Sequence, residues 1–261
     1  MASAVSAVKR LWALDGATFT LESGLLVLGA SGEVTIPVPT FLIEHERGLV
    51  LFDTGVVPAA VEDPEGVYGE LADHINLAFT TEQRVDKQIE ALGFKTSDVT
   101  HVVVSHAHFD HTGALYLFPE AKFYIGAADL PYTFWPNPAA AIFFRRPDIE
   151  ATRSFDWHPV QGDHDLFGDG SIQILAMPGH TPGNSSLLVR LPDRSFVLTG
   201  DTVHLRSALT DVLPMGSDFS TQDSIRSIHR LRHVAESLDA SVWIAHDPED
   251  WKDFAAPRCF E

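Results

Sequence analysis

Residues 102–113, VVVSHAHFDHTG, place three histidines and an aspartate within six positions directly after a run of valines. Successive valines are typical of a buried β-strand, because β-branched side chains pack well on a pleated surface. Beyond the strand, His106, His108 and Asp110 alternate and would project to one side of an extended chain, while His111 begins a helical pattern. Four such side chains at one strand end indicate a functional site, and metal binding explains their clustering better than a chance arrangement does.

Other apolar runs also end in candidate metal ligands. The run at 171–177 leads to His180, the run at 195–198 leads to Asp201, and the run at 241–245 leads to His246. Because ligands gather where strands finish in α/β architectures, we expect these ends to converge. The predicted metal ligands are His106, His108, Asp110, His111, His180, Asp201 and His246.

The donor atoms in this set are imidazole nitrogens and carboxylate oxygens. The chain has one cysteine, Cys259, so the sequence predicts neither a thiolate-rich metal cluster nor a disulfide framework. Neutral imidazoles with a few carboxylates suit zinc or a neighbouring first-row metal, whereas calcium and magnesium prefer mostly oxygen. We therefore expect divalent metal ions, with zinc first and iron, cobalt or manganese as alternatives.

The sequence pattern predicts an α/β protein. Residues 39–55 and 184–201 each read as two apolar strands joined by a polar turn, and each stretch reaches an aspartate beside a glycine. Helices are predicted at residues 80–93, with a capping box from Thr80 and Gln83 and a cap at Gly93, and at residues 220–238. We expect the second helix to pack by one face, on which helical spacing places Ile225, Ile228, Arg232, Ala235 and Leu238. No Pro- or Ser-rich linker divides the chain, so we expect one domain over residues 1–261, with sheets inside and helices outside.

The formal net charge of −18 restricts the partners of the protein. Nucleic-acid binding normally requires clustered Lys and Arg, so a polyanionic partner is disfavoured. No segment approaches the roughly 20 apolar residues that span a bilayer, and residues 1–16 lack the apolar run of a signal peptide. We expect a cytoplasmic protein that does not bind membranes.

Several motifs resemble those of the metallo-β-lactamase superfamily. SHAHFDHTG looks like its His-x-His-x-Asp-His signature, and DTG at 53–55, PGHTPG at 178–183, TGDT at 199–202 and AHD at 245–247 occur in the order that this superfamily uses. The resemblance covers residues 40–247 and implies an αββα sandwich with a dinuclear metal centre. It assigns the ligands as one set of His106, His108 and His180, a second set of Asp110, His111 and His246, and a bridging Asp201. It also implies that Asp53 orients a ligand histidine through a hydrogen bond.

Within that superfamily, the layout of the whole chain is similar to that of the N-acyl homoserine lactonases. The similarity rests on Phe109 in HFDH, the position of Asp201, the GHTPG segment and a short tail after His246. Such quorum-quenching enzymes are expected to open a small lactone by attack of a metal-bridging hydroxide, while the two metals hold the carbonyl oxygen and the departing ring oxygen. The resemblance implies that Asp110 delivers a proton to that alkoxide. Homodimers are frequent among similar lactonases, so a homodimer is one option for this chain.

Two alternative functions remain open. A glyoxalase II-like thioester hydrolase shares the ligand pattern, but it ordinarily adds a basic, helical C-terminal region, and only fifteen residues follow His246. A non-catalytic metal-binding scaffold would be expected to have lost a ligand, and all seven positions are intact. A secreted β-lactamase and a ribonuclease fit less well, because the first predicts an export signal and the second an electropositive surface.

Two further features concern the substrate. The lactonases commonly have a tyrosine three residues after the bridging aspartate, and this sequence has His204 there. Its imidazole could supply the same hydrogen bond, with a protonation state that changes near neutral pH, or it could simply face solvent. Residues 129–149, rich in aromatics and proline, read either as a loop over the core or as an apolar substrate wall. The candidate pocket residues are Phe109, Phe134, Trp135, Phe143 and Phe144.

Overall fold

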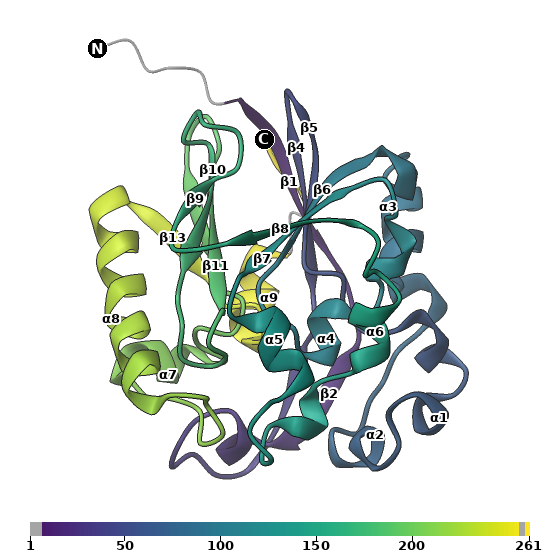
Figure 1. Cartoon of the computed structure of the whole chain (residues 1–261). Helices are drawn as coiled ribbons and strands as arrows, with labels where there is room; N and C mark the ends of the chain where they lie inside the picture. Colours follow the sequence, from purple (N-terminus) through teal and green to yellow (C-terminus); the bar gives the residue numbers. More distant parts are fainter. Residues whose placement is uncertain (1–6, 256–258) are drawn as a thin grey trace.

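Two β-sheets face each other in the computed structural model of this chain, which describes residues 7–255 and 259–261 (Figure 1). In spatial order, the strands of the first sheet are β14 (Cys259–Phe260), β1 (Val8–Leu14), β4 (Thr40–His45), β5 (Gly48–Phe52), β6 (Val99–Val104), β7 (Lys122–Gly126) and β8 (Asp156–Val160). Those of the second sheet are β13 (Ala240–Trp243), β12 (Ser195–Leu198), β11 (Ser185–Arg190), β10 (Ile172–Ala176) and β9 (His164–Asp165). A separate ribbon pairs β2 (Thr18–Glu22) with β3 (Glu33–Pro37).

Helices cover the outer sides of both sheets. The α-helices of the described ranges are α1 (Pro64–Tyr68), α2 (Glu70–His74), α3 (Val85–Ala91), α4 (Phe109–Thr112), α5 (Asp129–Phe134), α6 (Arg146–Glu150), α7 (Arg206–Asp211), α8 (Thr221–Leu238) and α9 (Pro248–Phe254). Short 3-10 helices are η1 (Ser23–Leu25), η2 (Pro58–Val61), η3 (Thr81–Gln83), η4 (Thr96–Asp98), η5 (Leu115–Leu117) and η6 (Ala141–Phe143). Because α3 packs on the first sheet and α8 on the second, the predicted αββα sandwich is confirmed.

Alternating side chains explain why the sheets stack in this way. In β6, Val102 and Val104 pack outward with the helices, whereas Val103 faces the second sheet. In β12, Val197 packs outward toward α8, whereas Phe196 faces the first sheet. Successive side chains of a strand point to opposite faces, so an uninterrupted apolar strand contributes to the core between the sheets and to an outer layer at once.

The two predicted strand-turn-strand units are antiparallel hairpins, one in each sheet. β4 pairs with β5, and β11 pairs with β12. Each second strand leads into an aspartate through a tight turn, with Asp53 itself at φ 60° and Gly200, before Asp201, at φ 51°. A Cβ on Gly200 would lie 2.7 Å from the Ser105 Cβ, so glycine is required there sterically as well.

The predicted helix at residues 80–93 is divided into two. Gln83 accepts a hydrogen bond from the Thr80 N–H at 3.0 Å, as the capping box predicted, but the first turn is the 3-10 helix η3. Arg84 then has an extended ψ of 136°, and α3 begins at the next residue. Gly93, at φ 87°, follows the end of the helix as expected.

Helix α8 occupies the segment predicted for it, but its buried face is partly different. Its buried residues are Ser224, Ser227, Ile228, Leu231 and Ala235. The prediction was wrong for three residues that are exposed, Ile225, Arg232 and Leu238. The cause is that the helix turns its serines toward the loop after β10, where the Ser227 hydroxyl donates to the Pro178 carbonyl at 2.6 Å.

Residues 129–149 contain three short helices, α5, η6 and α6, where a loop was expected. Each has at most six residues, which is too short for a 3.6-residue apolar period to show in the sequence. Pro147 stands in the first turn of α6, a position where proline favours a helix start rather than a loop.

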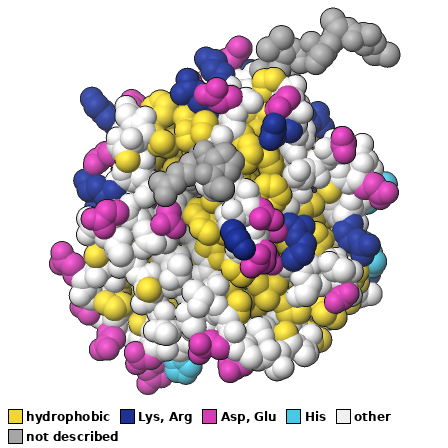
Figure 2. Space-filling view, turned by 180° about the vertical axis from the view of Figure 1, so that it is seen from behind, with side chains coloured by type: hydrophobic (Ala, Val, Ile, Leu, Met, Phe, Trp, Pro, Cys, Tyr) yellow, Lys and Arg dark blue, Asp and Glu magenta, His cyan; other side chains and the backbone are white. Residues whose placement is uncertain are grey.

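The surface reflects the acidic composition. Seen from behind (Figure 2), Lys and Arg lie in the upper two thirds of the view, and its lowest part carries Asp and Glu instead. None of the helices in the described ranges is both long and apolar enough to cross a bilayer.

Candidate metal centre

The seven predicted metal ligands lie together at the end of the sandwich where strands of both sheets finish. Their positions are His106 and His108 after β6, Asp110 and His111 in α4, His180 after β10, Asp201 after β12, and His246 after β13. All seven are at least nine-tenths buried. Because β5, β6 and β7 run parallel, as do β12 and β13, their carboxyl ends deliver these side chains to one edge.

The first group of donor atoms belongs to His106, His108, His180 and Asp201. His180 Nε2 lies 3.0 Å from His108 Nδ1 and 3.4 Å from Asp201 Oδ2. His106 Nε2 lies 3.7 Å from the same Asp201 oxygen.

The second group consists of Asp110, His111 and His246, and it also faces Asp201. His111 Nε2 lies 3.5 Å from Asp110 Oδ2 and 3.4 Å from Asp201 Oδ1. His246 Nε2 lies 3.1 Å from that Asp201 oxygen and 3.8 Å from Asp110 Oδ2. Since Oδ1 of Asp201 faces this group and Oδ2 faces the first, its carboxylate stands between the two.

These donors fit a pair of divalent metal ions. Zinc bonds nitrogen and oxygen at about 2.0–2.2 Å, so neighbouring ligands of a tetrahedral ion lie roughly 3.3–3.6 Å apart, close to the spacings found here. Moreover, His106 Nε2, His111 Nε2 and Asp201 Oδ1 are buried without a hydrogen-bond partner among the described residues. Buried polar atoms are seldom left unpaired, because the loss of hydration is costly, and metal ions would satisfy all three.

Asp53 supports the second group. Its Oδ2 lies 2.8 Å from His111 Nδ1, and its Oδ1 accepts the Ser105 N–H at 2.7 Å. The carboxylate therefore directs His111 Nε2 toward Asp201 and ties the ligand-bearing loop to the end of β5. The left-handed backbone of Asp53 costs conformational energy, which these two hydrogen bonds offset.

Three other ligand histidines have a partner on the nitrogen that points away from the cluster. His106 Nδ1 lies 3.0 Å from the Ser105 hydroxyl, and His246 Nδ1 lies 2.8 Å from the Pro37 carbonyl. His180 Nδ1 lies 3.1 Å from Asp218 Oδ1. The sequence interpretation missed these partners, because a serine, a proline carbonyl and a loop aspartate carry no motif of their own.

Asp129 is a further residue that sequence reasoning missed as part of the site. Its fully buried carboxylate accepts the Ala107 N–H at 2.9 Å and the Gly183 N–H at 2.6 Å. Ala107 lies between two ligand histidines, and Gly183 lies three residues after a third, so this one side chain joins two ligand loops. Burial raises the pKa of Asp129 to about 6, although both N–H groups act against this shift.

The charge state of the cluster favours cations. Burial lowers the pKa of His106 and His108 well below the usual value, so both rings are neutral at pH 7. Burial also disfavours protonation of His111, but Asp201 and Asp110 outweigh it and raise its pKa well above the usual value. Burial opposes ionisation of Asp201 too, but the neighbouring histidines hold its pKa well below its usual range. The second group thus attracts positive charge.

An apolar cavity opens on to both ligand groups. It contains about 540 Å³ of empty space, counting space open to solvent. The metal-site side of its wall includes His108, Asp110, His180, Asp201 and His246; the remainder is His204 with the apolar residues Phe19, Leu21, Leu25, Leu26, Ile36, Ile75, Phe109, Phe143 and Met215.

The aromatic residues proposed for a pocket fall into two sets. Phe109 and Phe143 line the cavity, and the ring of Phe144 packs edge-on against His108, with 4.6 Å between the centroids. Phe134 and Trp135 are not among the residues that line the cavity, and Trp135 is 88% exposed at the end of α5.

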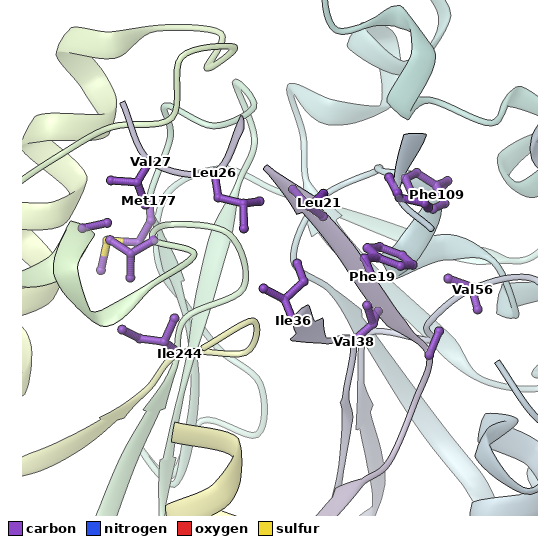
Figure 3. Packing of buried hydrophobic residues seen from close by; sticks show 14 of the residues in the cluster. Phe19, Leu21, Leu26, Val27, Ile36, Val38, Val56, Phe109, Met177 and Ile244 are labelled. Carbon is purple, nitrogen blue, oxygen red and sulfur yellow. The ribbon is translucent and has the colours of Figure 1, made fainter. Parts of the chain in front are cut away.

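Most of the apolar part of the cavity wall was missed from sequence, because five of its nine residues come from the β2-β3 ribbon and the segment between its strands. In Figure 3, Phe19 lies beside Phe109, with Leu21 and Ile36 nearby, and Leu26 approaches from the facing side. The rings of Phe19 and Phe109 are stacked with 5.7 Å between centroids. In a sequence, such apolar strand residues cannot be distinguished from core residues. Only the folded position of the ribbon shows that they line the same cavity as the candidate metal ligands.

His204 lies in the cavity wall rather than in solvent. It is 5% exposed, and its Nε2 lies 3.1 Å from Asp201 Oδ2. Its ring is parallel to that of His246, with 5.8 Å between centroids. Burial lowers the pKa of His204, against the opposing effect of Asp201, so a neutral imidazole is favoured at pH 7.

An αββα sandwich with two groups of nitrogen and oxygen donors at its strand ends defines a class of protein that can hold two metal ions at one edge of its sheets. The chain belongs to the metallo-β-lactamase superfamily, whose sequence profile matches residues 35–238.

Several relatives of this chain are named N-acyl homoserine lactonases. The N-acyl homoserine lactonase AttM of Rhizobium radiobacter is 36% identical over 231 residues, which cover 87% of this chain and 88% of that protein. An N-acyl homoserine lactonase of Bacillus cereus is 28% identical and is matched over 84% of each chain.

Solved structures support the fold. The AiiA protein of B. thuringiensis, in a variant with N-decanoyl-L-homoserine bound at the active site, has a TM-score of 0.83 at 24% identity and covers 95% of this chain and 96% of its own. AidC, a dizinc quorum-quenching lactonase, has a TM-score of 0.69 at 17% identity, with 94% and 92% covered.

Proposed function

We propose that this chain is an N-acyl homoserine lactonase, a dinuclear-metal hydrolase that opens the lactone ring of its substrate. The observation that carries the proposal is the apolar cavity that opens directly on to both ligand groups, because it offers an acyl chain a place beside the metal site. The relatives named N-acyl homoserine lactonases support the same substrate class.

Two zinc ions suit the donor set, with iron, cobalt or manganese as alternatives. The first ion would be held by His106, His108 and His180 and the second by Asp110, His111 and His246, with Asp201 shared between them. Bound there, such ions polarise a carbonyl and lower the pKa of a coordinated water, the chemistry that hydrolysis of an acyl bond requires.

The side chains around the cavity would orient the lactone and manage its proton. Hydrolysis adds water to the carbonyl, breaks the bond from carbonyl carbon to ring oxygen, and requires a proton on that oxygen. Asp110 lines the cavity and is proposed to take a proton from the attacking water and pass it to the ring oxygen. His204 is the proposed hydrogen-bond donor to the substrate; its neutral imidazole carries one N–H, which would be donated to the substrate in place of Asp201 Oδ2. Phe19, Phe109 and Phe143 would contact the acyl chain, each buried methylene of which contributes roughly 0.8 kcal/mol to binding.

A small neutral substrate also agrees with the charge of the protein. With 36 acidic and 18 basic residues, the chain repels polyanions, and acidic side chains gather at the lower end of the view in Figure 2. We therefore propose no nucleic-acid partner.

The test is a pH-stat assay on protein whose metal content is measured in the same sample. The substrates are N-acyl homoserine lactones, simple lactones without an acyl arm, and S-lactoylglutathione. We expect acid release from the N-acyl homoserine lactones, faster than from simple lactones. Acid release from the thioester alone would replace the proposed function with a thioester hydrolase, and no turnover of any substrate by metal-loaded protein would indicate a binding scaffold.

A further inference from the structure

We propose that Asp218 is a positioning residue that couples the metal ligand His180 to the apolar wall of the cavity. Through this coupling, the metal group of His106, His108 and His180 would respond to the length of the acyl chain that occupies the cavity. The part that concerns the acyl chain rests on the proposed lactonase function.

The side chain of Asp218 joins two parts of the site directly. It is 3% exposed, and its two oxygens have different partners. Oδ1 lies 3.1 Å from His180 Nδ1, and Oδ2 accepts the Met215 N–H at 3.0 Å. Met215 lines the cavity, so one carboxylate holds both a metal ligand and a residue of the substrate wall.

Backbone hydrogen bonds fasten the same loop to the ligand loop. The Phe219 N–H donates to the His180 carbonyl at 3.1 Å, and the Ser220 N–H donates to the Gly179 carbonyl at 3.0 Å. A Cβ on Gly179 would lie 2.3 Å from the Ser224 backbone nitrogen, so the ligand loop and the start of α8 are in close contact. His180 therefore cannot shift without moving the loop that carries Asp218.

The other side of the loop reaches the opposite wall of the cavity. The Leu28 N–H donates to the Pro214 carbonyl at 2.9 Å. Leu28 follows the segment that contributes Leu25 and Leu26 to the cavity. A ligand that presses on Met215 or Leu26 thus acts on a segment that is hydrogen-bonded, through Asp218, to His180.

Asp53 is a natural control because it holds the other metal group in a different way. Its carboxylate contacts His111 and the Ser105 N–H, and neither residue lines the cavity. Replacing Asp53 should weaken metal binding without changing any response to the acyl chain. Asp211, exposed at the end of α7, controls for removal of one negative charge.

The experiment measures zinc release to a chelator from zinc-loaded protein, alone and with N-butanoyl- or N-decanoyl-L-homoserine as the probe. In the wild type, we expect the decanoyl probe to slow the release of one of the two zinc ions several-fold more than the butanoyl probe does. Asp218→Asn should weaken zinc binding by about 10- to 100-fold and make the two probes equivalent within twofold. Asp53→Asn should also release zinc faster but keep the difference between the probes, and Asp211→Asn should match the wild type.

A second variant keeps the test decisive if Asp218→Asn fails to fold. Met215→Ala keeps the contact between Asp218 and His180 but removes the side chain through which the cavity would act on it, so the difference between the probes should disappear at probe concentrations that saturate the protein. A probe difference that survives in Asp218→Asn or in Met215→Ala would overturn the coupling, as would a wild type that responds to neither probe. The pH-stat assay decides the proposed function separately, because zinc release does not require turnover.

Discussion

Asp201 has an unusual position at the scale of single atoms, because each of its two oxygens faces a different group of histidines. His111 and His246 approach Oδ1, whereas His106, His180 and His204 approach Oδ2. Four of these imidazoles, His111, His246, His204 and His106, hold the pKa of the buried carboxylate well below its usual range. An ionised carboxylate in this position could bind one cation with each of its two oxygens.

His204 is the first residue whose role can be measured. Since its Nε2 lies within hydrogen-bond distance of the shared carboxylate and its ring lines the cavity, we expect His204→Ala to lower kcat/KM for an N-acyl homoserine lactone by about 10- to 100-fold, a loss of roughly 1.4–2.7 kcal/mol of transition-state stabilisation. His204→Tyr restores a donor and should retain substantial activity. Both variants are compared at equal metal content, and an alanine variant with unchanged kinetics would remove His204 from the reaction.

The residues that sequence reasoning found and missed differ in a physical way. The convergence of the seven candidate ligands could be predicted, because each follows an apolar run or belongs to one compact motif, so the local sequence carries the signal. Asp218 contacts His180, 38 positions away, and Asp129 contacts Gly183, 54 positions away. No motif in the sequence around Asp218 or Asp129 indicates these contacts. Their roles follow only from the tertiary fold.

At the scale of elements, strands were easier to predict than helix faces. Both hairpins were predicted, since each alternates between two apolar layers and turns at polar residues. For α8, apolar spacing alone selected Ile225, yet the helix buries two serines instead, because they fit against the loop after β10. Periodicity reports which residues are apolar, not how the helix is rotated on its sheet.

The rotation of α8 gives a stability prediction. Ile228 is fully buried against the second sheet, so Ile228→Ala should lower the free energy of unfolding by about 2–5 kcal/mol. Ile225 is 36% exposed, and Ile225→Ala should cost much less, about 1 kcal/mol or below. Urea unfolding followed by circular dichroism measures both; equal losses would mean that the helix is rotated toward the face predicted from sequence.

The whole molecule has two ends with different chemistry. The candidate metal ligands His106 and His108 follow the carboxyl end of β6. His101, near the start of the strand, lies among aromatic rings, 6.0 Å from that of Tyr124 and 4.9 Å from that of Phe167. Burial lowers the pKa of His101 to about 4, and Lys122, His45 and His158 add to the effect. The His101 imidazole is therefore neutral near pH 7.

The far end should make stability depend on pH. The unfolded chain protonates His101 near pH 6.5, but the folded chain does so only near pH 4, so the unfolded state binds more protons between these values. The contribution of His101 is complete above about pH 6.5 and is lost as the pH falls toward 4. We expect His101→Gln to reduce the loss of unfolding free energy between pH 7 and pH 5 in urea titrations of metal-free protein. His229→Gln, on the exposed side of α8, should leave the pH dependence as in the wild type; an equal slope in all three proteins would exclude His101 as a cause.

The division of the ligands between the two sheets has a consequence for the newly made chain. His106, His108, Asp110 and His111 leave the ribosome together, but Asp201 and His246 follow up to about 135 residues later, which is a delay of roughly 7 to 27 s at ordinary rates of synthesis. During that interval the nascent chain offers three histidines and a carboxylate without the shared aspartate. A site that draws its donors from both sheets has its full set of side chains only once the second sheet has docked on the first, so its ability to hold two ions would depend on the folded chain and not on the HxHxDH segment alone.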